Sequence, residues 1–472
     1  MVRINTNIPS LTAQVNLARS SRDMNSTLQR LSSGLRINRG ADDPAGLIAS
    51  ETLRSEIASI ERAIGNTQRA SNVIATTEAS LAEVANLLVD IKGLTIEAAN
   101  AGALSTEEIR ANQLQVDSAV DSITRIANST AFAGQKLLNG NLAYQTSAVA
   151  TSAITALNIQ AVQLGDANFL NVNISGITSA EKGELLLSAS TVGAASVVLE
   201  IASNRGVEVF NFISNYQTSN VRDAINAVSD STGVSAVFSG SILKITSVDY
   251  GTDSFVSVRA LPSGAAMAVE DTAGTTTQRD EGADIQVAIN GAATTGVGRD
   301  VTLNTNSLDM NMTFDAAFVS TTSFQVTGGG FLFQLGPHIT TQEQVNIGVQ
   351  SIVASRLGSV ENGFLNEIVT GGSKSLVAGQ TRSAGNIIEE AIQQVAVLRG
   401  RLGAFERNTL DTNANALRIS LENITASESS IRNADFAAET AALTRSQILV
   451  NAGTSVLALA NQSPQSVLAL LQ

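Results

Sequence analysis

The chain has 472 residues, with no Cys, no Trp, one His and a formal net charge of −13. Without Cys it can form neither disulfides nor zinc–thiolate clusters, and His338 alone cannot supply a two-His zinc motif. Hydrophobic residues make up 43% of the chain and aromatic residues only 4%. This composition predicts helices packed closely through small side chains, and it predicts no enzyme, no metal site and no cofactor.

Charge is distributed unevenly along the chain. Residues 1–40 carry six Arg and one acid, Asp23, whereas residues 151–360 carry 18 acidic and 8 basic residues. Because binding to nucleic acid requires a basic face, the acidic middle argues against a nucleic-acid partner.

Neither end of the chain has the pattern of a membrane or secretory segment. Polar residues interrupt the first 30 residues, so no apolar signal region is expected there. No charged residue follows Arg445, but Asn451, Thr454 and Ser455 break the apolar run. We therefore expect the last segment to be a helix buried in protein, without membrane insertion.

The first 130 residues have the spacing of long helices. Asp42-Asp43-Pro44 predicts a helix start, with an acidic cap before a proline. Apolar residues then recur every seven positions, with Thr67 in the one place that lacks them, which predicts a seam for a partner helix: Leu53, Ile60, Ile74, Leu81 and Leu88. A turn and a second helix are expected over residues 102–128.

The two far ends carry apolar stripes of their own. Residues 383–432 have a helical pattern, and a seven-residue repeat follows it at Phe436, Leu443, Val450 and Leu457. The amino-terminal segment has a corresponding set at Ile8, Leu11, Val15, Leu28, Leu31 and Leu35. Neither end has a globular body to cover, so we expect both to become ordered against a partner, for which a second copy of the chain would serve.

The middle of the chain, about 145–375, is of a different kind. Alternating apolar residues predict short strands, with a helix among them at 219–229; the strands are expected at 196–201, 207–212, 242–246, 285–289 and 330–335. Thr340-Thr-Gln-Glu343 has the spelling of a helix start. The predicted fold class is α+β, with long terminal helices in a coiled-coil-like bundle and a β-rich α+β outer insert.

Other conspicuous residues have structural interpretations. Gly328-Gly-Gly330 lacks the spacing and the lysine of a phosphate-binding loop and is expected to form a turn between strands. We expect His338 to be a surface or capping residue. The adjacent acids Glu389 and Glu390 point to different sides of a helix and do not form a catalytic pair.

Motifs at both ends resemble those of bacterial flagellin. At the start these are Met1-Val-Arg-Ile-Asn-Thr-Asn7, Leu31-Ser-Ser-Gly-Leu-Arg-Ile-Asn38 and Ala41-Asp-Asp-Pro-Ala-Gly-Leu-Ile-Ala49. At the end they are Ser446-Gln-Ile-Leu-Val-Asn-Ala-Gly453 and Asn461-Gln-Ser-Pro-Gln-Ser-Val-Leu468. The resemblance covers about 140 residues at the start and 90 at the end. Asp223-Ala-Ile-Asn-Ala-Val228 is similar to an insertion module found in some flagellins.

The resemblance implies a structural subunit of the helical flagellar filament used for motility. Its implied organisation is an amino-terminal inner-tube helix (1–45), a helical layer (46–145), a surface-exposed insert (146–375), a second part of the helical layer (376–432) and a carboxy-terminal inner-tube helix (433–472). The implied location is extracellular. The implied partners are other copies of the chain, an export chaperone, a cap protein and hook-junction proteins.

Flagellins are also recognised by an innate-immune receptor of animals, through the region that includes Asp90, Leu94 and Gln115 here. The family pattern has a basic residue in place of Asp90 and an acid in place of Gln115, so we expect weak recognition.

Two other functions remain open on the sequence. A hook–filament junction protein would share the helical ends, although the ending Val467-Leu-Ala-Leu-Leu471 is more similar to a filament subunit. A secreted adhesin would need a binding face in the insert, where the sequence shows no ligand motif.

Overall fold

The computed structural model describes residues 6–469, apart from 101, 165–168, 188–195, 215, 241, 262–268, 271–275 and 306, with side chains to residue 462. Residues 1–5 of the first motif and the side chains of the ending at 467–471 lie outside this description. The chain divides into two units: residues 1–70, 334–339 and 407–472 form the first, and residues 71–333 and 340–406 form the second.

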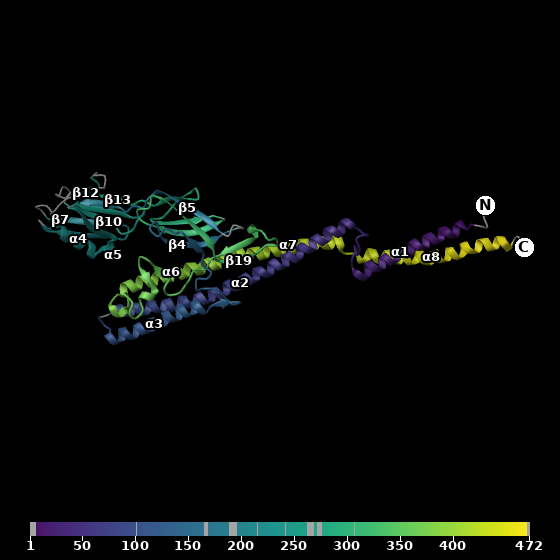
Figure 1. Cartoon of the computed structure of the whole chain (residues 1–472), viewed down its shortest axis with the longest axis horizontal. Helices are drawn as coiled ribbons and strands as arrows, with labels where there is room; N and C mark the ends of the chain where they lie inside the picture. The colour runs from purple at the N-terminus through teal and green to yellow at the C-terminus, as the bar shows by residue number, and fades with distance from the viewer. Residues whose placement is uncertain are drawn as a thin grey trace. The chain divides into compact units, whose positions relative to one another are not determined.

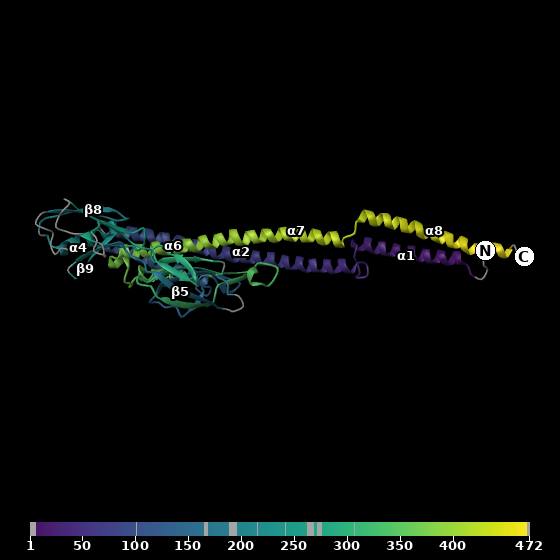
Figure 2. The same ribbon diagram turned by 90° about the horizontal axis from the view of Figure 1, so that it is seen from above.

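The first unit is helical. It contains α1 (Ile8–Ser33), the first part of α2 (Pro44–Ala99), α7 (Thr412–Arg432) and α8 (Phe436–Ala469). Helices α1 and α8 lie side by side in both views (Figure 1 and Figure 2). The expected start of α2 is confirmed, because the Asp43 carboxylate accepts a hydrogen bond from the Gly46 N–H at 2.9 Å.

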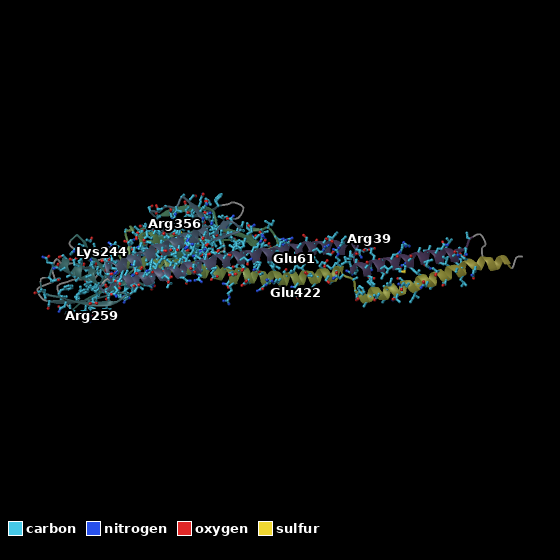
Figure 3. The ribbon with its side chains drawn as sticks, turned by 90° about the horizontal axis from the view of Figure 1, so that it is seen from below. Arg39, Glu61, Lys244, Arg259, Arg356 and Glu422 are labelled. Carbon is cyan, nitrogen blue, oxygen red and sulfur yellow. The ribbon has the colours of Figure 1, made fainter. Side chains whose placement is uncertain are left out.

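Helices α2 and α7 share an apolar core in the first unit. Ile60, Ala63 and Leu417 are buried there, and Ile64, Leu421 and Ile424 pack around them. Charged side chains such as Glu61 of α2 and Glu422 of α7 remain exposed (Figure 3). The predicted seven-residue repeat along α2 is confirmed from Ile60 onward, since Ile60, Thr67, Ile74, Leu81 and Leu88 are all buried, whereas its first member, Leu53, is half-buried.

The continuous helical pattern predicted over 383–432 is interrupted. Helix α6 (Thr381–Phe405) is followed by six residues of π-helix, Glu406–Asp411, before α7 begins. A π-turn inserts an extra residue into the hydrogen-bond ladder and keeps the apolar spacing on both sides, so periodicity alone does not reveal it.

In the second unit, α3 (Thr106–Ser129) and α6 lie against the rest of α2. Arg399 of α6 is 3.8 Å from Glu78 of α2, and the Thr130 hydroxyl donates to Ser80 at 3.1 Å. The predicted start of the second helix is confirmed: Ser105 and Glu108 form a capping box at the first turn of α3. Each side chain accepts from the backbone N–H of the other residue.

A first β core is built from two sheets. One has the order β15-β14-β5-β18-β3 and the other β16-β17-β4, and they enclose buried residues such as Phe314 and Phe324. The strands are β3 (Gln145–Ser147), β4 (Ile154–Val162), β5 (Leu170–Thr178), β14 (Gln286–Ile289), β15 (Ala292–Thr295), β16 (Asp300–Asn304), β17 (Leu308–Phe314) and β18 (Thr321–Gly328).

The residues of a second β core are inserted into the sequence of the first, between β5 and β14. Sheets β12-β6-β10-β9 and β13-β11-β7-β8 enclose it together with Val221 and Ile225 of helix α4 (Figure 1). Its elements are β6 (Glu184–Leu187), β7 (Val197–Ala202), β8 (Val207–Phe212), α4 (Thr218–Ala227), α5 (Ser229–Thr232), β9 (Val234–Ser239), β10 (Ile242–Ser247), β11 (Phe255–Leu261), β12 (Val269–Glu270) and β13 (Arg279–Glu281).

Short hairpins and single turns complete the second unit and its connections. They are β1 (Ala131–Phe132) with β2 (Gln135–Lys136), β19 (Phe331–Gln334) with β20 (Gln344–Ile347), β21 (Gly358–Ser359) with β22 (Gly363–Phe364), and the 3₁₀ turns η2 (Thr341–Glu343), η3 (Leu365–Glu367) and η4 (Leu376–Ala378). The α+β class predicted from the sequence is confirmed.

Individual predictions in the insert have different outcomes. All five expected strands and the helix near 219–229 form, as β7, β8, β10, β14, β19 and α4. The helix start expected at 340–343 is wrong: Thr340 makes no side-chain cap hydrogen bond, and the turn leads directly into β20. Gly328, Gly329 and Gly330 form the expected turn, with φ of 151°, 100° and 78°. A Cβ on Gly329 would lie 2.3 Å from the Ala143 carbonyl oxygen.

Candidate functional site

The paired helices α1 and α8 are the candidate site, because they carry most of the predicted functional residues. They run antiparallel. The Asn7 side-chain amide donates to the Ala460 carbonyl oxygen at 2.8 Å near one end, and Arg30 pairs with Glu439 at 3.2 Å near the other.

The face that the two helices share combines fully buried small and polar side chains with half-buried large ones, namely Leu17, Leu31, Leu443, Val450 and Leu457. Its most buried members are Ser10, Ala13, Thr27 and Ser446, each between 6% and 8% exposed. Gly453 lies so close to α1 that a Cβ there would be 3.2 Å from Leu17 Cδ1. Burial follows a spacing of three and four residues along α1, which is the pattern of a coiled-coil seam. The large apolar side chains of this seam are therefore only partly covered by the pairing of the two helices.

A second set of large apolar side chains lies outside this seam. On α1, Ile8, Leu11 and Val15 are 60%, 58% and 65% exposed. On α8, after the exposed Phe436 at its start, Ile448, Leu449, Val456 and Leu459 are exposed, and Leu459 reaches 70%. We call these seven residues, without Phe436, the outer stripes. Spacings of three, four and seven residues place most of each set on one side of its helix.

The apolar residues that the sequence predicted on the two terminal helices lie partly in the seam and partly on the outer side. Five of them are exposed, namely Ile8, Leu11, Val15, Leu28 and Phe436. The other five, Leu31, Leu35, Leu443, Val450 and Leu457, are half-buried within the chain. The seven-residue repeat on α8 selected mainly the row beside α1. Leu449 and Val456 were recognised beside that repeat, but Ile448 and Leu459 on the outer side were missed. The absence of charge after Arg445 was the signal for them, because a helix that is apolar all round is covered on more than one side.

Short backbone pairing joins the segment that follows α1 to the segment that precedes α8. Leu35 and Asn433 form an antiparallel bridge, and the Arg36 N–H donates to the Arg432 carbonyl oxygen at 2.7 Å. The Arg432 side chain donates to Glu51 of α2 at 2.7 Å. This junction holds residues from both ends of the sequence together.

Asp42 closes the loop that leads from α1 to α2. Its carboxylate accepts hydrogen bonds from the backbone N–H groups of Arg39 and Asn38, at 2.9 and 3.1 Å. These bonds, first that from Arg39 and then that from Asn38, hold the pKa of the carboxyl below its usual range because they favour the charged form.

The predicted receptor-facing residues lie on α2 and α3. Asp90 and Gln115 are exposed, and Leu94 is half-buried. Weak recognition by the receptor stays a prediction that rests on the side chains at these positions.

The described residues contain no group of three or more His, Cys, Asp or Glu placed to hold a metal ion. Within the same part of the chain, no helix has the length and hydropathy needed to cross a membrane. His338 is exposed in the loop after β19, where its carbonyl oxygen accepts from the Gln334 amide at 2.6 Å.

Comparison with known proteins identifies the two helical ends. Residues 4–143 match the family model of the bacterial flagellin N-terminal helical region, and residues 386–471 match that of the C-terminal helical region. B-type flagellin of Pseudomonas aeruginosa is 28% identical over 99% of both chains. Flagellin B of Helicobacter pylori is 28% identical over 100% of this chain and 99% of its own.

Among solved structures, similarity is more remote. Flagellar hook associated protein-3 of Legionella pneumophila is 13% identical over 81% of this chain and 98% of its own, with a TM-score of 0.33. The D2-D3 domains of the Escherichia coli flagellar cap protein are 18% identical, cover 39% of this chain and 98% of their own, and have a TM-score of 0.28. The family assignment depends on the sequence matches at both ends and along the full length: this chain belongs to the bacterial flagellin family.

Proposed function

We propose that copies of this flagellin polymerise by burying the outer stripes of α1 and α8 against one another. As a flagellin, the chain is a structural subunit of the extracellular flagellar filament. The observation that carries the proposal is that the pairing of α1 with α8 leaves a set of large apolar side chains, the outer stripes, in solvent.

Burial of these residues would supply the driving force for assembly. Complete burial of one Val, Leu or Ile side chain contributes about 1.5–3 kcal/mol. Monomeric proteins rarely expose continuous apolar rows, so the outer stripes are expected to be covered in the functional state. If the surfaces that meet on two copies differ, the contact does not close, and it generates an open helical filament.

We propose that the terminal helices gain their stability on polymerisation. The fully buried residues of the seam between α1 and α8 are Ser, Ala and Thr, and its large apolar residues are only half-buried. The isolated pair therefore gains less from apolar burial than a fully packed core would. Because binding stabilises only the ordered form, assembly and helix formation would then be one coupled event. The division into an inner-tube layer, an outer helical layer and a projecting insert remains part of this proposal, with the boundaries given above.

The same surface suggests which other proteins the chain meets. Before assembly, the uncharged outer side of α8 would need protection from aggregation, which supports an export chaperone that binds this helix. At the two filament ends, unpaired stripes would contact hook-junction and cap proteins. We also propose that the chain has no enzymatic activity, since flagellins are structural proteins and this one has no Cys and a single His.

A hook–filament junction protein or an adhesin is not favoured. Flagellins of Pseudomonas aeruginosa, Helicobacter pylori and Escherichia coli match along 99% or more of this chain.

The proposal is tested with one apolar-to-acidic substitution in the outer stripe. Leu459→Asp should prevent elongation of short filament seeds, because the charge would be buried at the contact between copies. The matched control is Val237→Asp on β9, a similarly exposed apolar residue of the insert at 59%, which should elongate like the parent chain. Electron microscopy measures filament length and circular dichroism checks the fold. Filaments of normal length from Leu459→Asp would contradict the proposal.

A further inference from the structure

Lys182 differs from the other lysines of the chain in its surroundings. All five lysines are described, and the ammonium groups of the other four each have a polar partner: Lys92 pairs with Glu389, Lys136 donates to the Ser129 carbonyl oxygen, Lys244 pairs with Glu184, and Lys374 pairs with Glu367. Among the described residues, Lys182 Nζ has no hydrogen bond and no carboxylate oxygen within 4 Å. Nζ lies over the ring of Tyr250, 4.6 Å from the ring centre.

A second cation approaches the same ring. The Arg299 guanidinium carbon lies 5.0 Å from the centre of Tyr250. The two acids nearby are engaged elsewhere: Glu361 pairs with Arg299, and Asp249 accepts two hydrogen bonds from Arg205 Nη2, at 2.6 and 2.8 Å. Lys182 is therefore a half-buried ammonium next to another cation, with no carboxylate of its own.

These surroundings favour the neutral amine. Burial, followed by the charge of Arg299, lowers the pKa of Lys182, while Asp249 and Glu361 oppose the shift. A lysine held in this way has a larger unprotonated fraction at neutral pH than one that is ion-paired. The unprotonated amine is the form that reacts as a nucleophile.

We propose that Lys182 is the preferred acylation site of this chain, with acyl thioesters as the chemical class of donor. The Nζ lone pair attacks the thioester carbonyl carbon and forms the C–N bond. The C–S bond breaks, its electron pair leaves on sulfur, and the proton lost from nitrogen passes through water to the thiolate. The products are an amide and a free thiol, with no oxidant or reductant required.

Acylation removes a half-buried charge that Arg299 repels, so the repulsion between the two cations ends. The contact of the ammonium with the Tyr250 ring is given up in exchange. The amide keeps its apolar stem beside Tyr250. At Lys92, Lys244 and Lys374, by contrast, acylation would break an existing ion pair.

The test is competitive labelling of the full-length, unpolymerised chain. A limiting amount of a small acetyl thioester is applied at a series of pH values, and the remaining amines are then labelled completely with an isotopically heavy acetyl reagent. Peptide mass spectrometry gives the rate at each lysine and, separately, at the α-amino group. Lys182 should react several-fold faster than the other four lysines near neutral pH, and its rate should reach a plateau at lower pH. A rate within the range of the other lysines, or the same plateau pH, would overturn the proposal.

Two substitutions should move the rate in opposite directions. Arg299→Gln removes the neighbouring cation and should slow labelling of Lys182, whereas Asp249→Asn removes an opposing anion and should speed it. Tyr250→Phe keeps the ring and should leave the rate unchanged. Lys92 serves as the internal control in each variant. If Arg299→Gln also changes the labelling rate of Lys92, its effect is not specific to Lys182, and Asp249→Asn then becomes the variant that tests the proposal. If Asp249→Asn leaves the rate at Lys182 unchanged or lowers it, the proposal is wrong.

Discussion

The side-chain amide of Asn7 donates a 2.8 Å hydrogen bond to the carbonyl oxygen of Ala460, which lies 453 positions later in the chain. Asn7 also caps α1, because its side-chain oxygen accepts from the Ser10 N–H at 3.1 Å. One residue thus begins the first helix and attaches it to the last. Both ends of the chain are consequently held in register for any contact that α1 and α8 make together.

Because α1 and α8 approach closely at Gly453, we predict that this position accepts only a small side chain. An added Cβ would lie 3.2 Å from Leu17 Cδ1, the far end of a flexible side chain. Gly453→Ala should be nearly neutral, since the contact is offset by a gain of about 1 kcal/mol in helix propensity. Gly453→Val should separate the helices and lower the yield of filaments. Hydrogen exchange of α8 amides measures the effect, and equal protection in both variants would contradict it.

Gln113 of α3 is predicted to be the most costly polar residue to replace in the helical part of the second unit. It is 1% exposed and donates to the Ile368 carbonyl oxygen at 2.9 Å, while its own oxygen accepts from the Leu376 N–H at 2.8 Å. Gln113→Leu would leave two backbone groups unsatisfied, at about 1–3 kcal/mol each.

Thermal unfolding of the unpolymerised chain measures the loss. The control is Gln115→Leu, because Gln115 is exposed on the same helix. A loss no larger than that of the control would show that water replaces the lost partners.

Ile60 is predicted to anchor the core between α2 and α7. It is 1% exposed, so Ile60→Ala should destabilise the first unit by about 2–5 kcal/mol through lost burial and the remaining cavity. Ile48→Ala on the same helix should change stability by less than about 0.5 kcal/mol, because Ile48 is 70% exposed in the monomer. Urea unfolding followed by hydrogen exchange of α2 compares the two variants, and similar losses would argue against this core.

Asp42 predicts an acid-sensitive loop between α1 and α2. The bonds from Arg39 and Asn38 depress its folded-state pKa, so the stability it contributes is present above the unfolded value of about 3.9. That contribution is lost as the pH falls through the depressed folded-state value. Asp42→Asn should therefore increase hydrogen exchange in this loop near pH 6 and have little effect near pH 2. A difference that persists unchanged at pH 2 would show that charge is not the cause.

The sequence alone does not show which residues of α8 lie on the side away from α1, and this determines which residue is suitable for the test. The seven-residue repeat points to Leu457, but this residue lies between Gly453 and Ala460, both of which face α1. An acidic substitution at 457 would disturb the seam as well as any contact between copies. Leu459, which belongs to no repeat, is the residue that separates the two effects.

Local patterns in the sequence determined the helices, their starts at Pro44 and Thr106, the buried row along α2, the two-part α+β organisation and the family. These features depend on interactions between residues a few positions apart, such as the Ser105–Glu108 capping box, so a single chain segment is sufficient to specify them. Tertiary structure alone decided three features: the pairing of α1 with α8, the π-helix before α7 and the surroundings of Lys182. Each of them depends on which distant segment occupies the neighbouring space, and periodicity within one segment contains no information about its partner.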